Sequence, residues 1–378
     1  MQVNSSQPIA DAWVEIDLDR MRNNLATIFR RLPEGSRYCA VLKADAYGHG
    51  IDRVAPVLAD EGVDFAAITD NADVFALRRA GFAGRIMRLR GAAPEEARQV
   101  CGLGVEELVT GATAARALAD PADPRPVHLP INAGGMGRDG LELSTEYGRA
   151  EAREILTLPG LQVVGLATHF PINSEDELAA GRARFEADVA WCLHMGKLSR
   201  DALLVHAASS LGLMAAAEIK FDMVRDGAAL WGIVGPRSEF GNVMSLRARI
   251  TSINRLPEGA TVGYDRVARL TRETRVANVS IGYANGVRRT MANRAQVAVR
   301  GQIVPLIGKI SMNALTLDVT DIPDAQAGDT VTLFGTDGAA RITRAMTEAA
   351  TGTIMADLYC DWGRSNRRVY PYDQGPKT

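Results

Sequence analysis

The sequence is poor in three features, each of which would define a class of protein. It holds 4 cysteines in 378 residues (Cys39, Cys101, Cys192 and Cys360), which are too few and too scattered for a disulfide scaffold or a zinc site. No apolar run reaches the roughly 20 residues of a membrane-spanning helix, and the N-terminal stretch MQVNSSQPIADAW lacks the regions of a signal peptide. We therefore expect free buried thiols, no metal site, and a cytoplasmic protein, or a periplasmic one if this is a processed mature form.

Excess charge of one sign is also missing. The 43 Lys and Arg residues nearly balance 45 Asp and Glu, for a net charge of −2, so the basic footprint that nucleic-acid binding requires is absent. Lysine itself is scarce, with only five positions: Lys43, Lys197, Lys220, Lys309 and Lys377. Hydrophobic residues make up 47% of the chain, enough for a large core divided between two domains.

The first two thirds of the chain alternate between short apolar runs and amphipathic stretches. Helical spacing is clearest over residues 17–32, 71–80, 143–156 and 174–196. The apolar runs predict eight strands at 38–45, 64–69, 85–90, 106–111, 126–132, 162–170, 203–209 and 223–232. This alternation predicts a parallel (β/α)8 barrel over residues 12–240. A doubly wound open sheet is the alternative.

After residue 240 the pattern changes to short alternating runs separated by Gly, Pro, Asn and Asp, with helix only near 343–362. This predicts an antiparallel β domain over residues 241–378, against which residues 1–11 could pack.

Polar residues stand where the predicted barrel strands end, which is the catalytic end of such barrels. Lys43 closes the first apolar strand, and its interpretations are a snorkelling lysine or a Schiff-base lysine made reactive by desolvation. Tyr47 and His49 follow in AYGHG, where glycines would let backbone and hydroxyl approach an anion. The other strand ends carry Arg88, Arg90, Asn132, Arg138, His169, His206, Ser209, Ser210, Arg225 and Gly227. Together these residues predict an active site that binds an anion, with phosphate the natural candidate.

The sequence resembles the alanine racemases, the pyridoxal-phosphate enzymes built from a barrel and a β domain. The resemblance begins with AVLKADAYGHG (40–50) and continues in the same order through most of the chain, in THF (168–170), HAASS (206–210), DMVRDGAALWG (222–232), TVGYD (261–265), IGYANG (281–286) and GKISMN (308–313).

This resemblance implies a role for each matching residue. Lys43 is expected to hold pyridoxal 5'-phosphate as a Schiff base and to act as one acid/base, with Tyr264 of a second subunit as the other. The cofactor is expected to contact Tyr47, His169, Ser210, Arg225 and Gly227, with Arg225 at the pyridine nitrogen. Arg138, Met312, Asn313 and Tyr283 are expected around the substrate. The resemblance thus implies a homodimer with shared active sites.

Departures from the family pattern favour the broad-specificity amino-acid racemases. Where the family has KxDTGMxR with a carbamylated lysine, this chain has LPINAGGMGR, with Pro130 at the lysine position and Asn132 for aspartate. We expect Arg88 and Asn132 to bind an anion, such as chloride, in place of that negative charge. The family's phosphate-binding tyrosine falls on Ala356, and Tyr359, one helical turn later, is a candidate replacement. The disulfide that the exported broad-specificity enzymes form from the position of Cys39 has Phe65 at its partner position.

The sequence therefore predicts an amino-acid racemase, an isomerase with a two-base mechanism and a broad range of amino-acid substrates. A strict alanine racemase is the first alternative. A pyridoxal-phosphate decarboxylase or aldolase of the same architecture, or a non-catalytic pyridoxal-phosphate-binding protein, are the others. Arg225 argues against the decarboxylase, which uses an acidic residue at that position, and Tyr264 argues against a carrier, which has no use for a second base.

Overall fold

The structure, a computed structural model, describes residues 11–171, 174–209, 221–235 and 239–371. Two compact units divide the chain. The barrel unit comprises residues 22–46 and 51–240, and the β unit comprises residues 1–21, 47–50 and 241–378. The segment 47–50 therefore belongs to the β unit, although the residues on both sides of it in the chain belong to the barrel unit.

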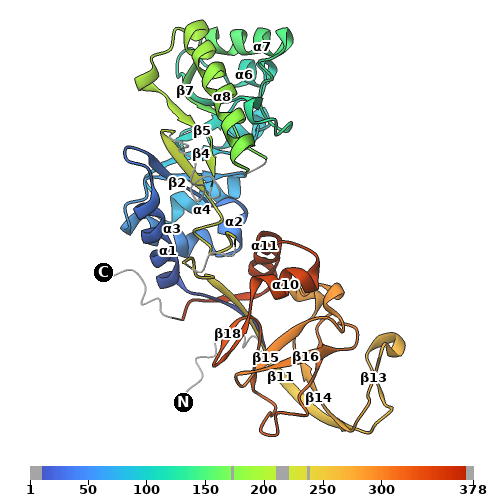
Figure 1. Cartoon of the computed structure of the whole chain (residues 1–378). Helices are drawn as coiled ribbons and strands as arrows, with labels where there is room; N and C mark the ends of the chain where they lie inside the picture. Colours follow the sequence, from blue (N-terminus) through green and yellow to red (C-terminus); the bar gives the residue numbers. More distant parts are fainter. Residues whose placement is uncertain (1–10, 172–173, 210–220, 236–238, 372–378) are drawn as a thin grey trace. The chain divides into compact units, whose positions relative to one another are not determined.

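The barrel unit is built on a parallel sheet whose strands follow one another around the barrel in chain order (Figure 1). The two ends of the sheet, β8 and β9, are separated by Ala207 alone, so the barrel is nearly closed, as the alternating sequence pattern predicts. In sheet order the strands are β8 (Leu204–His206), β7 (Leu161–Ala167), β6 (Arg125–Pro130), β5 (Val105–Leu108), β4 (Arg85–Arg88), β3 (Phe65–Ile68), β2 (Arg37–Val41), β10 (Met223–Asp226) and β9 (Ala208–Ser209).

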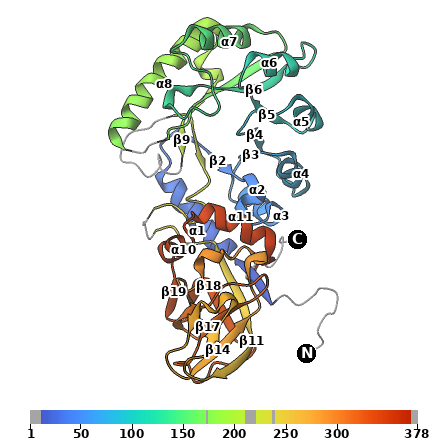
Figure 2. The same cartoon turned by 90° about the vertical axis from the view of Figure 1, so that its right-hand side faces the viewer.

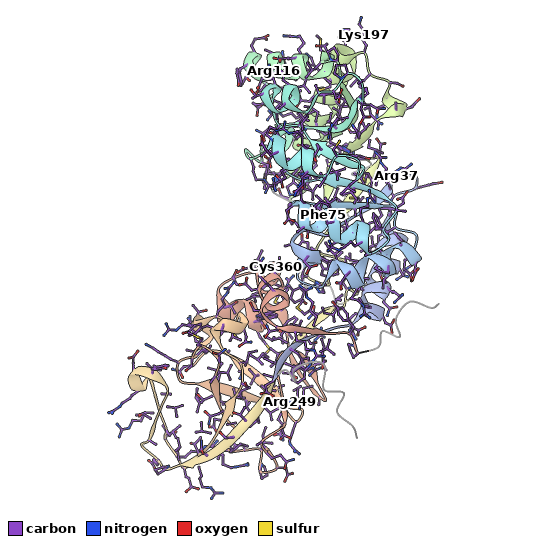
Figure 3. The ribbon with its side chains drawn as sticks, turned by 180° about the vertical axis from the view of Figure 1, so that it is seen from behind. Arg37, Phe75, Arg116, Lys197, Arg249 and Cys360 are labelled. Carbon is purple, nitrogen blue, oxygen red and sulfur yellow. The ribbon has the colours of Figure 1, made fainter. Side chains whose placement is uncertain are left out.

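Helices lie outside these strands and cover the outer face of the sheet (Figure 2), while the inner face is enclosed by the barrel itself. Among these strands, all four residues of β3 are buried, and so are the last four of β2. The helices are α1 (Leu18–Arg31), α3 (Ile51–Asp60), α4 (Asn71–Arg79), α5 (Pro94–Gln99), α6 (Ala112–Leu118), α7 (Glu146–Thr157) and α8 (Glu175–Gly196). In Figure 3, Arg116 of α6 and Lys197, which follows α8, lie at the same end of the barrel unit.

The β unit is an antiparallel sheet that closes on itself, because the long strand β11 pairs with both β14 and β18. The closed ring runs β18 (Thr330–Asp337), β15 (Gln296–Val299), β16 (Gln302–Ile307), β17 (Leu315–Asp318), β14 (Thr274–Val279) and β11 (Met244–Leu256). Outside the ring are β19 (Ala340–Ile342), the hairpin β12 (Thr261–Val262) and β13 (Ala268–Arg269), and the helices α10 (Arg344–Thr351) and α11 (Met355–Ser365).

The N-terminal strand β1 (Ala12–Ile16) belongs to the β unit. It pairs antiparallel with β11 and parallel with β20 (Arg367–Val369). The sequence had placed residues from 12 onward with the barrel, but the start of the chain is hydrogen-bonded to the C-terminal sheet. Alternation along a single strand does not identify the sheet it joins.

All four cysteines lie within the described residues, and none forms a disulfide. Cys39 and Cys192 are buried, as expected, and burial raises the pKa of the Cys192 thiol to about 12. Cys101 is exposed and Cys360, on α11, is partly exposed (Figure 3), so the expectation of buried thiols is wrong for both. Across the part of the chain that the structure describes, no helix has the length and apolar character needed to cross a membrane.

Candidate active site

Lys43 lies two residues after the end of β2 and begins a left-handed turn. The turn α2 (Lys43–Tyr47) has φ values of 53 to 56° at residues 44–47, none of which is glycine. Side chains destabilise this conformation by about 1–2 kcal/mol per residue, so the surrounding structure must hold it. The carboxylate of Asp45 accepts a hydrogen bond from the Ile51 N–H at 2.8 Å, which ties the turn to the start of α3.

The predicted site residue His169 has a lowered pKa, to which three other predicted site residues contribute. His169 follows β7, and burial together with the positive charges of Arg225, Arg138 and Lys43 lowers its pKa to about 4. The imidazole is therefore neutral at physiological pH. An imidazole within the electrostatic influence of three cations is a suitable neighbour for an anionic, ring-containing ligand, because the cations balance the ligand's charge and the neutral imidazole can pack against it.

Arg225 lies on β10 and is buried in a chain of hydrogen bonds. Its guanidinium donates to the Thr168 carbonyl at 2.8 Å, to the His206 carbonyl at 3.0 Å and to Nδ1 of His206. Nε2 of His206 lies 2.9 Å from Nδ1 of His128, whose Nε2 lies 2.7 Å from the Glu106 carboxylate. Burial lowers the pKa of Arg225 to about 10, so this side chain keeps its positive charge at neutral pH.

The Glu106 end of this chain carries a negative charge. Although burial alone would raise the pKa of Glu106, hydrogen bonds from His128 and Arg85 hold it below its usual value. Burial, and then the positive charge of Arg225, lower the pKa of His206 well below the ordinary value. Both histidines are therefore neutral, and a buried cation and a buried carboxylate are joined through two imidazoles.

Asn132 holds the loop that carries Arg138. Its side-chain oxygen accepts from the Gly137 N–H at 2.8 Å, and its amide nitrogen donates to Glu142 at 2.9 Å. The same loop packs against the end of β7, where a Cβ on Gly134 would lie 2.2 Å from the His169 carbonyl oxygen. Arg138 itself is 64% exposed, so the loop presents a guanidinium that is accessible to a ligand.

Arg88 has a structural role and is not available as an anion ligand in this structure. Its side chain is fully buried at the end of β4, and its N–H groups donate to Glu107, Glu96, Asn71 and the Thr69 carbonyl. All five donors of the guanidinium are used by these acceptors. Asn132 bonds to a different set of partners, Gly137 and Glu142, so the two residues share no hydrogen-bonding group.

Tyr359 also differs from expectation, because α11 turns it into the core of the β unit. Its side chain is fully buried, with ring centroids 5.2 Å from His49, 5.8 Å from Phe334 and 6.2 Å from Trp362. Burial raises the pKa of this phenol. The hydroxyl is enclosed by the side chains of the β unit, which does not favour a contact with phosphate, and the expected role of Tyr359 stays a prediction.

The same packing explains the glycines of AYGHG. A Cβ on Gly48 would lie 2.3 Å from the Tyr359 carbonyl oxygen, and one on Gly363 would lie 2.0 Å from the Gly48 carbonyl oxygen. His49 is buried beside α11, and its carbonyl accepts from the Tyr370 hydroxyl at 2.8 Å. Gly48 is therefore needed for the close backbone contact with α11, a role that the sequence did not predict. The expected approach of an anion to this loop stays a prediction.

The β unit presents its own predicted residues on the surface. Tyr264, Met312 and Tyr283 are 66%, 55% and 43% exposed, and Asn313 is also exposed. The loops that carry Tyr283 and Met312 are joined by backbone hydrogen bonds, including one of 2.9 Å from the Ala284 N–H to the Met312 carbonyl. Exposed aromatic and apolar side chains on neighbouring loops favour a surface that another chain covers.

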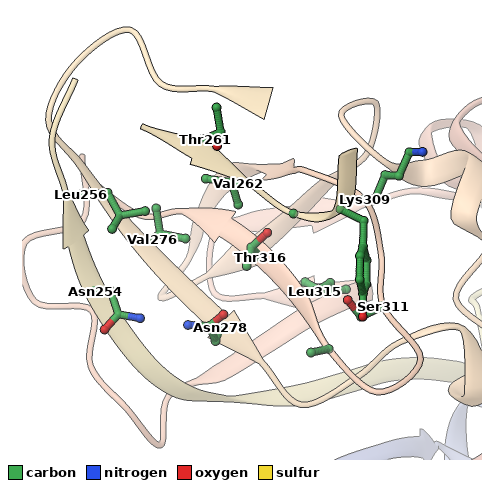
Figure 4. A pocket seen from close by; sticks show the side chains of 13 residues that line it. Asn254, Leu256, Thr261, Val262, Val276, Asn278, Lys309, Ser311, Leu315 and Thr316 are labelled. Carbon is green, nitrogen blue, oxygen red and sulfur yellow. The ribbon is translucent and has the colours of Figure 1, made fainter. Parts of the chain in front are cut away.

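A pocket of about 530 Å³ adjoins Tyr264 in the β unit. Lys309 and Ser311 lie at one end and Asn254 at the other (Figure 4). Lys309 pairs with Asp265, the residue after Tyr264, so the pocket continues the surface that bears the predicted second base.

Two predicted residues remain. Gly227 is buried after β10, beside Asp226, whose carboxylate accepts from the Ala229 and Leu230 N–H groups at 3.0 Å each. Ser210 lies outside the described residues. Among the described residues no group of three His, Cys, Asp or Glu side chains is placed to hold a metal ion.

Sequence reasoning missed Glu106, His128 and Asp73. Glu106 and His128 lie within the strands predicted at 106–111 and 126–132, where a charged or ionisable residue that is buried needs a partner. That signal could have identified them. Asp73 stands where an acidic residue in the first turn of a helix is common. Its position in the sequence therefore gives no sign of its contacts with the turn that follows Lys43.

Comparison with known proteins agrees with this geometry. Residues 16–234 match the N-terminal domain of alanine racemase, and residues 243–370 match its C-terminal domain. A broad specificity amino-acid racemase of Aeromonas hydrophila subsp. hydrophila is 39% identical over 366 residues, covering 95% of this chain and 90% of that protein.

Solved structures give the same result. Alanine racemase from Bacillus anthracis with bound L-Ala-P matches with a TM-score of 0.87 at 25% identity, over 98% of this chain and 97% of that one. Alanine racemase from Bartonella henselae, with covalently bound pyridoxal phosphate, shares the fold with a TM-score of 0.83 at 23% identity, over 96% of this chain and all of that one. The two domain matches together span nearly the whole chain, which belongs to the alanine racemase family.

Proposed function

We propose that this amino-acid racemase binds pyridoxal 5'-phosphate at the ends of its barrel strands, through the amine of Lys43. The observation that carries the proposal is the environment of His169, whose imidazole pKa is lowered first by burial and then by the positive charges of Arg225, Arg138 and Lys43. This donor set fits an anionic aromatic cofactor. Pyridoxal phosphate, when bound, supplies the electron sink that makes the substrate's Cα–H acidic.

The remaining barrel residues would fix that group in place. Arg225 would face the ring nitrogen, His169 the ring, and Tyr47, Ser210 and Gly227 the phosphate. Because the Arg225 guanidinium stays protonated at neutral pH, it gives no proton to a ring nitrogen. An electron sink weakened in this way favours return of the proton to Cα over competing reactions, which supports a racemase over a decarboxylase or aldolase.

Inversion at Cα needs acid/base groups on opposite faces, because a single base returns the proton to the face from which it came. Lys43 would serve one face and Tyr264 of a partner subunit the other. The exposure of Tyr264, Met312 and Tyr283 supports a homodimer in which the β domain (241–378) of one chain completes the barrel site (12–240) of the other. Arg138, the Met312 backbone and Asn313 would bind the substrate carboxylate and orient Tyr264.

A broad range of amino acids is the favoured specificity, with a strict alanine racemase as the alternative. Two observations support this choice. The Aeromonas relative is a broad specificity amino-acid racemase, and at the position of the family's modified lysine the chain has Pro130, which is buried at the end of β6. A proline in place of a long lysine adduct leaves more room for a substrate side chain.

The test incubates the purified holoenzyme with single L-amino acids, among them Ala, Ser, Lys, Arg and Met, and measures the D-isomer by chiral chromatography. Inversion of several long side chains supports the proposal. Inversion of alanine alone would establish the strict enzyme. No inversion of any, with cofactor bound, would leave a cofactor-binding protein without racemase activity.

A further inference from the structure

Asp73 is a buried carboxylate that the proposed mechanism does not use. It lies in the first turn of α4, is only 4% exposed, and receives two hydrogen bonds from the turn that follows Lys43. The Ala44 N–H donates to Oδ2 at 3.1 Å, and the Asp45 N–H donates to Oδ1 at 3.0 Å. The two oxygens of one side chain thus bind the two consecutive amides directly after the lysine.

These amides belong to the left-handed turn. At φ values of 56° and 55°, Ala44 and Asp45 occupy a conformation that non-glycine residues disfavour. An ionised carboxylate is a strong acceptor for two backbone N–H groups at once, so Asp73 stabilises the turn at its start. Its own backbone is fixed in turn, because the Asp73 N–H donates to the side chain of Asp70, the residue that caps α4, at 3.2 Å.

We propose that Asp73 is a positioning residue for Lys43, because its carboxylate holds the left-handed turn that sets where the lysine side chain begins. This inference rests on the proposed role of Lys43 as cofactor anchor and base. A proton-transfer group must lie within hydrogen-bond reach of the proton it moves, so a turn that relaxes would displace the amine while leaving the barrel intact.

The charge of Asp73 depends on its surroundings. Burial raises its pKa to about 7, and repulsion from the Asp70 and Asp45 carboxylates adds to this, whereas the hydrogen bonds from the Asp45 and Ala44 amides oppose it. Protonation removes one of the two acceptor positions. The turn should therefore tighten as the pH rises through the Asp73 pKa.

The experiment compares wild type with Asp73→Asn, Asp73→Glu and the control Asp70→Asn. Asparagine fits the same space but presents an NH2 group to one of the two amides. Glutamate keeps the charge, and Asp70→Asn removes a neighbouring charge from the same cluster without touching the turn. The readouts are kcat and KM of the holoenzyme, and hydrogen exchange of the Ala44 and Asp45 amides one pH unit either side of the Asp73 pKa, corrected for intrinsic exchange rates.

We expect Asp73→Asn to lose amide protection at both pH values and to lose about 10- to 100-fold in kcat, with KM changed far less, because misplacing a reacting group mainly affects the chemical step. Asp73→Glu should recover part of both. In Asp70→Asn the Asp73 pKa should be lower, because the repulsion from Asp70 is gone. The pH below which the Ala44 and Asp45 amides lose protection should therefore also be lower. Wild-type kcat or wild-type protection in Asp73→Asn would overturn the inference. A wild-type enzyme that inverts no amino acid would instead overturn the racemase function, whatever the amide protection.

Discussion

The guanidinium of Arg225 donates a hydrogen bond to Nδ1 of His206, and this contact fixes the protons of two further buried side chains. An accepting Nδ1 places the His206 proton on Nε2, from which it is donated to Nδ1 of His128. His128 must then carry its own proton on Nε2, facing the Glu106 carboxylate. Every donor along this path points away from Arg225, and the negative charge at its far end strengthens each acceptor.

Glu106→Gln tests this path. The substitution keeps an acceptor for His128 but removes the charge that pairs with Arg85, so we expect a loss of about 1–3 kcal/mol of stability at neutral pH. Because the folded-state pKa of Glu106 is depressed, the stability it contributes is present above its ordinary pKa of 4.5 and is lost as the pH falls through the lower, folded-state value. Thermal unfolding should therefore show wild type approaching the variant in acid. A difference that does not change with pH would contradict the ionised state.

Asn132→Ala should weaken substrate binding through the loop that carries Arg138. Losing the bonds to Gly137 and Glu142 leaves the loop less ordered, and we expect KM to rise by about tenfold with a smaller change in kcat. Ser144→Ala is the matched control, because Ser144 donates to the same Glu142 carboxylate without bonding the loop. Equal effects of the two variants would show that Glu142, and not the loop, is responsible.

Gly48→Ala should be far more harmful than Gly62→Ala, although both glycines have φ near 80°. Each substitution introduces a side chain into the left-handed region, at about 1–2 kcal/mol. Only at Gly48 does the new Cβ also meet a backbone atom, the Tyr359 carbonyl oxygen, while nothing lies within 4 Å at Gly62. Overpacking adds about 1–3 kcal/mol or more. Chemical denaturation measures both, and equal losses would contradict the tight contact with α11.

The pH dependence of folding stability should also show the effect of the buried charge of Asp73. Its pKa is raised from 3.8 to about 7 on folding, so ionisation destabilises the folded state progressively as the pH rises between these values. Asp73→Asn lacks this effect. The melting temperature of the variant, relative to wild type, should therefore increase from about pH 4 to about pH 7. A relative melting temperature that falls over this range would show that the hydrogen bonds from the Ala44 and Asp45 amides outweigh the cost of burying the charge.

The sequence predicts the architecture well because apolar strand runs and amphipathic helices carry the information locally. Lys43 stands out because a lysine at the end of a buried strand needs a reason to be there. Contacts between residues far apart in the sequence cannot be predicted from such local patterns. Tyr359 has the spacing of a replacement ligand, but which face of α11 is buried depends on Phe334 and His49, far away in the chain.

Arg88 shows the same limit. The pattern MRLR places two arginines on one side of a strand, and either an anion or protein carboxylates could neutralise them. The carboxylates that do so are Glu107, from the next strand of the barrel, for Arg88, and Glu96, from α5, for both arginines. Asp73 could not be predicted as a site residue, because its contacts depend on the left-handed backbone of residues 44–47. None of these residues is a glycine, so the sequence does not indicate that conformation.

The most direct test of the two-base account is the exchange of Cα–H in D2O by the Tyr264→Phe holoenzyme, measured separately on the L- and D-isomers of one substrate. If Lys43 and Tyr264 serve opposite faces, the variant should keep its bound cofactor and its visible absorbance band, continue to exchange the D-isomer, and lose exchange of the L-isomer. Equal rates on both isomers, whether kept or lost, would contradict the account.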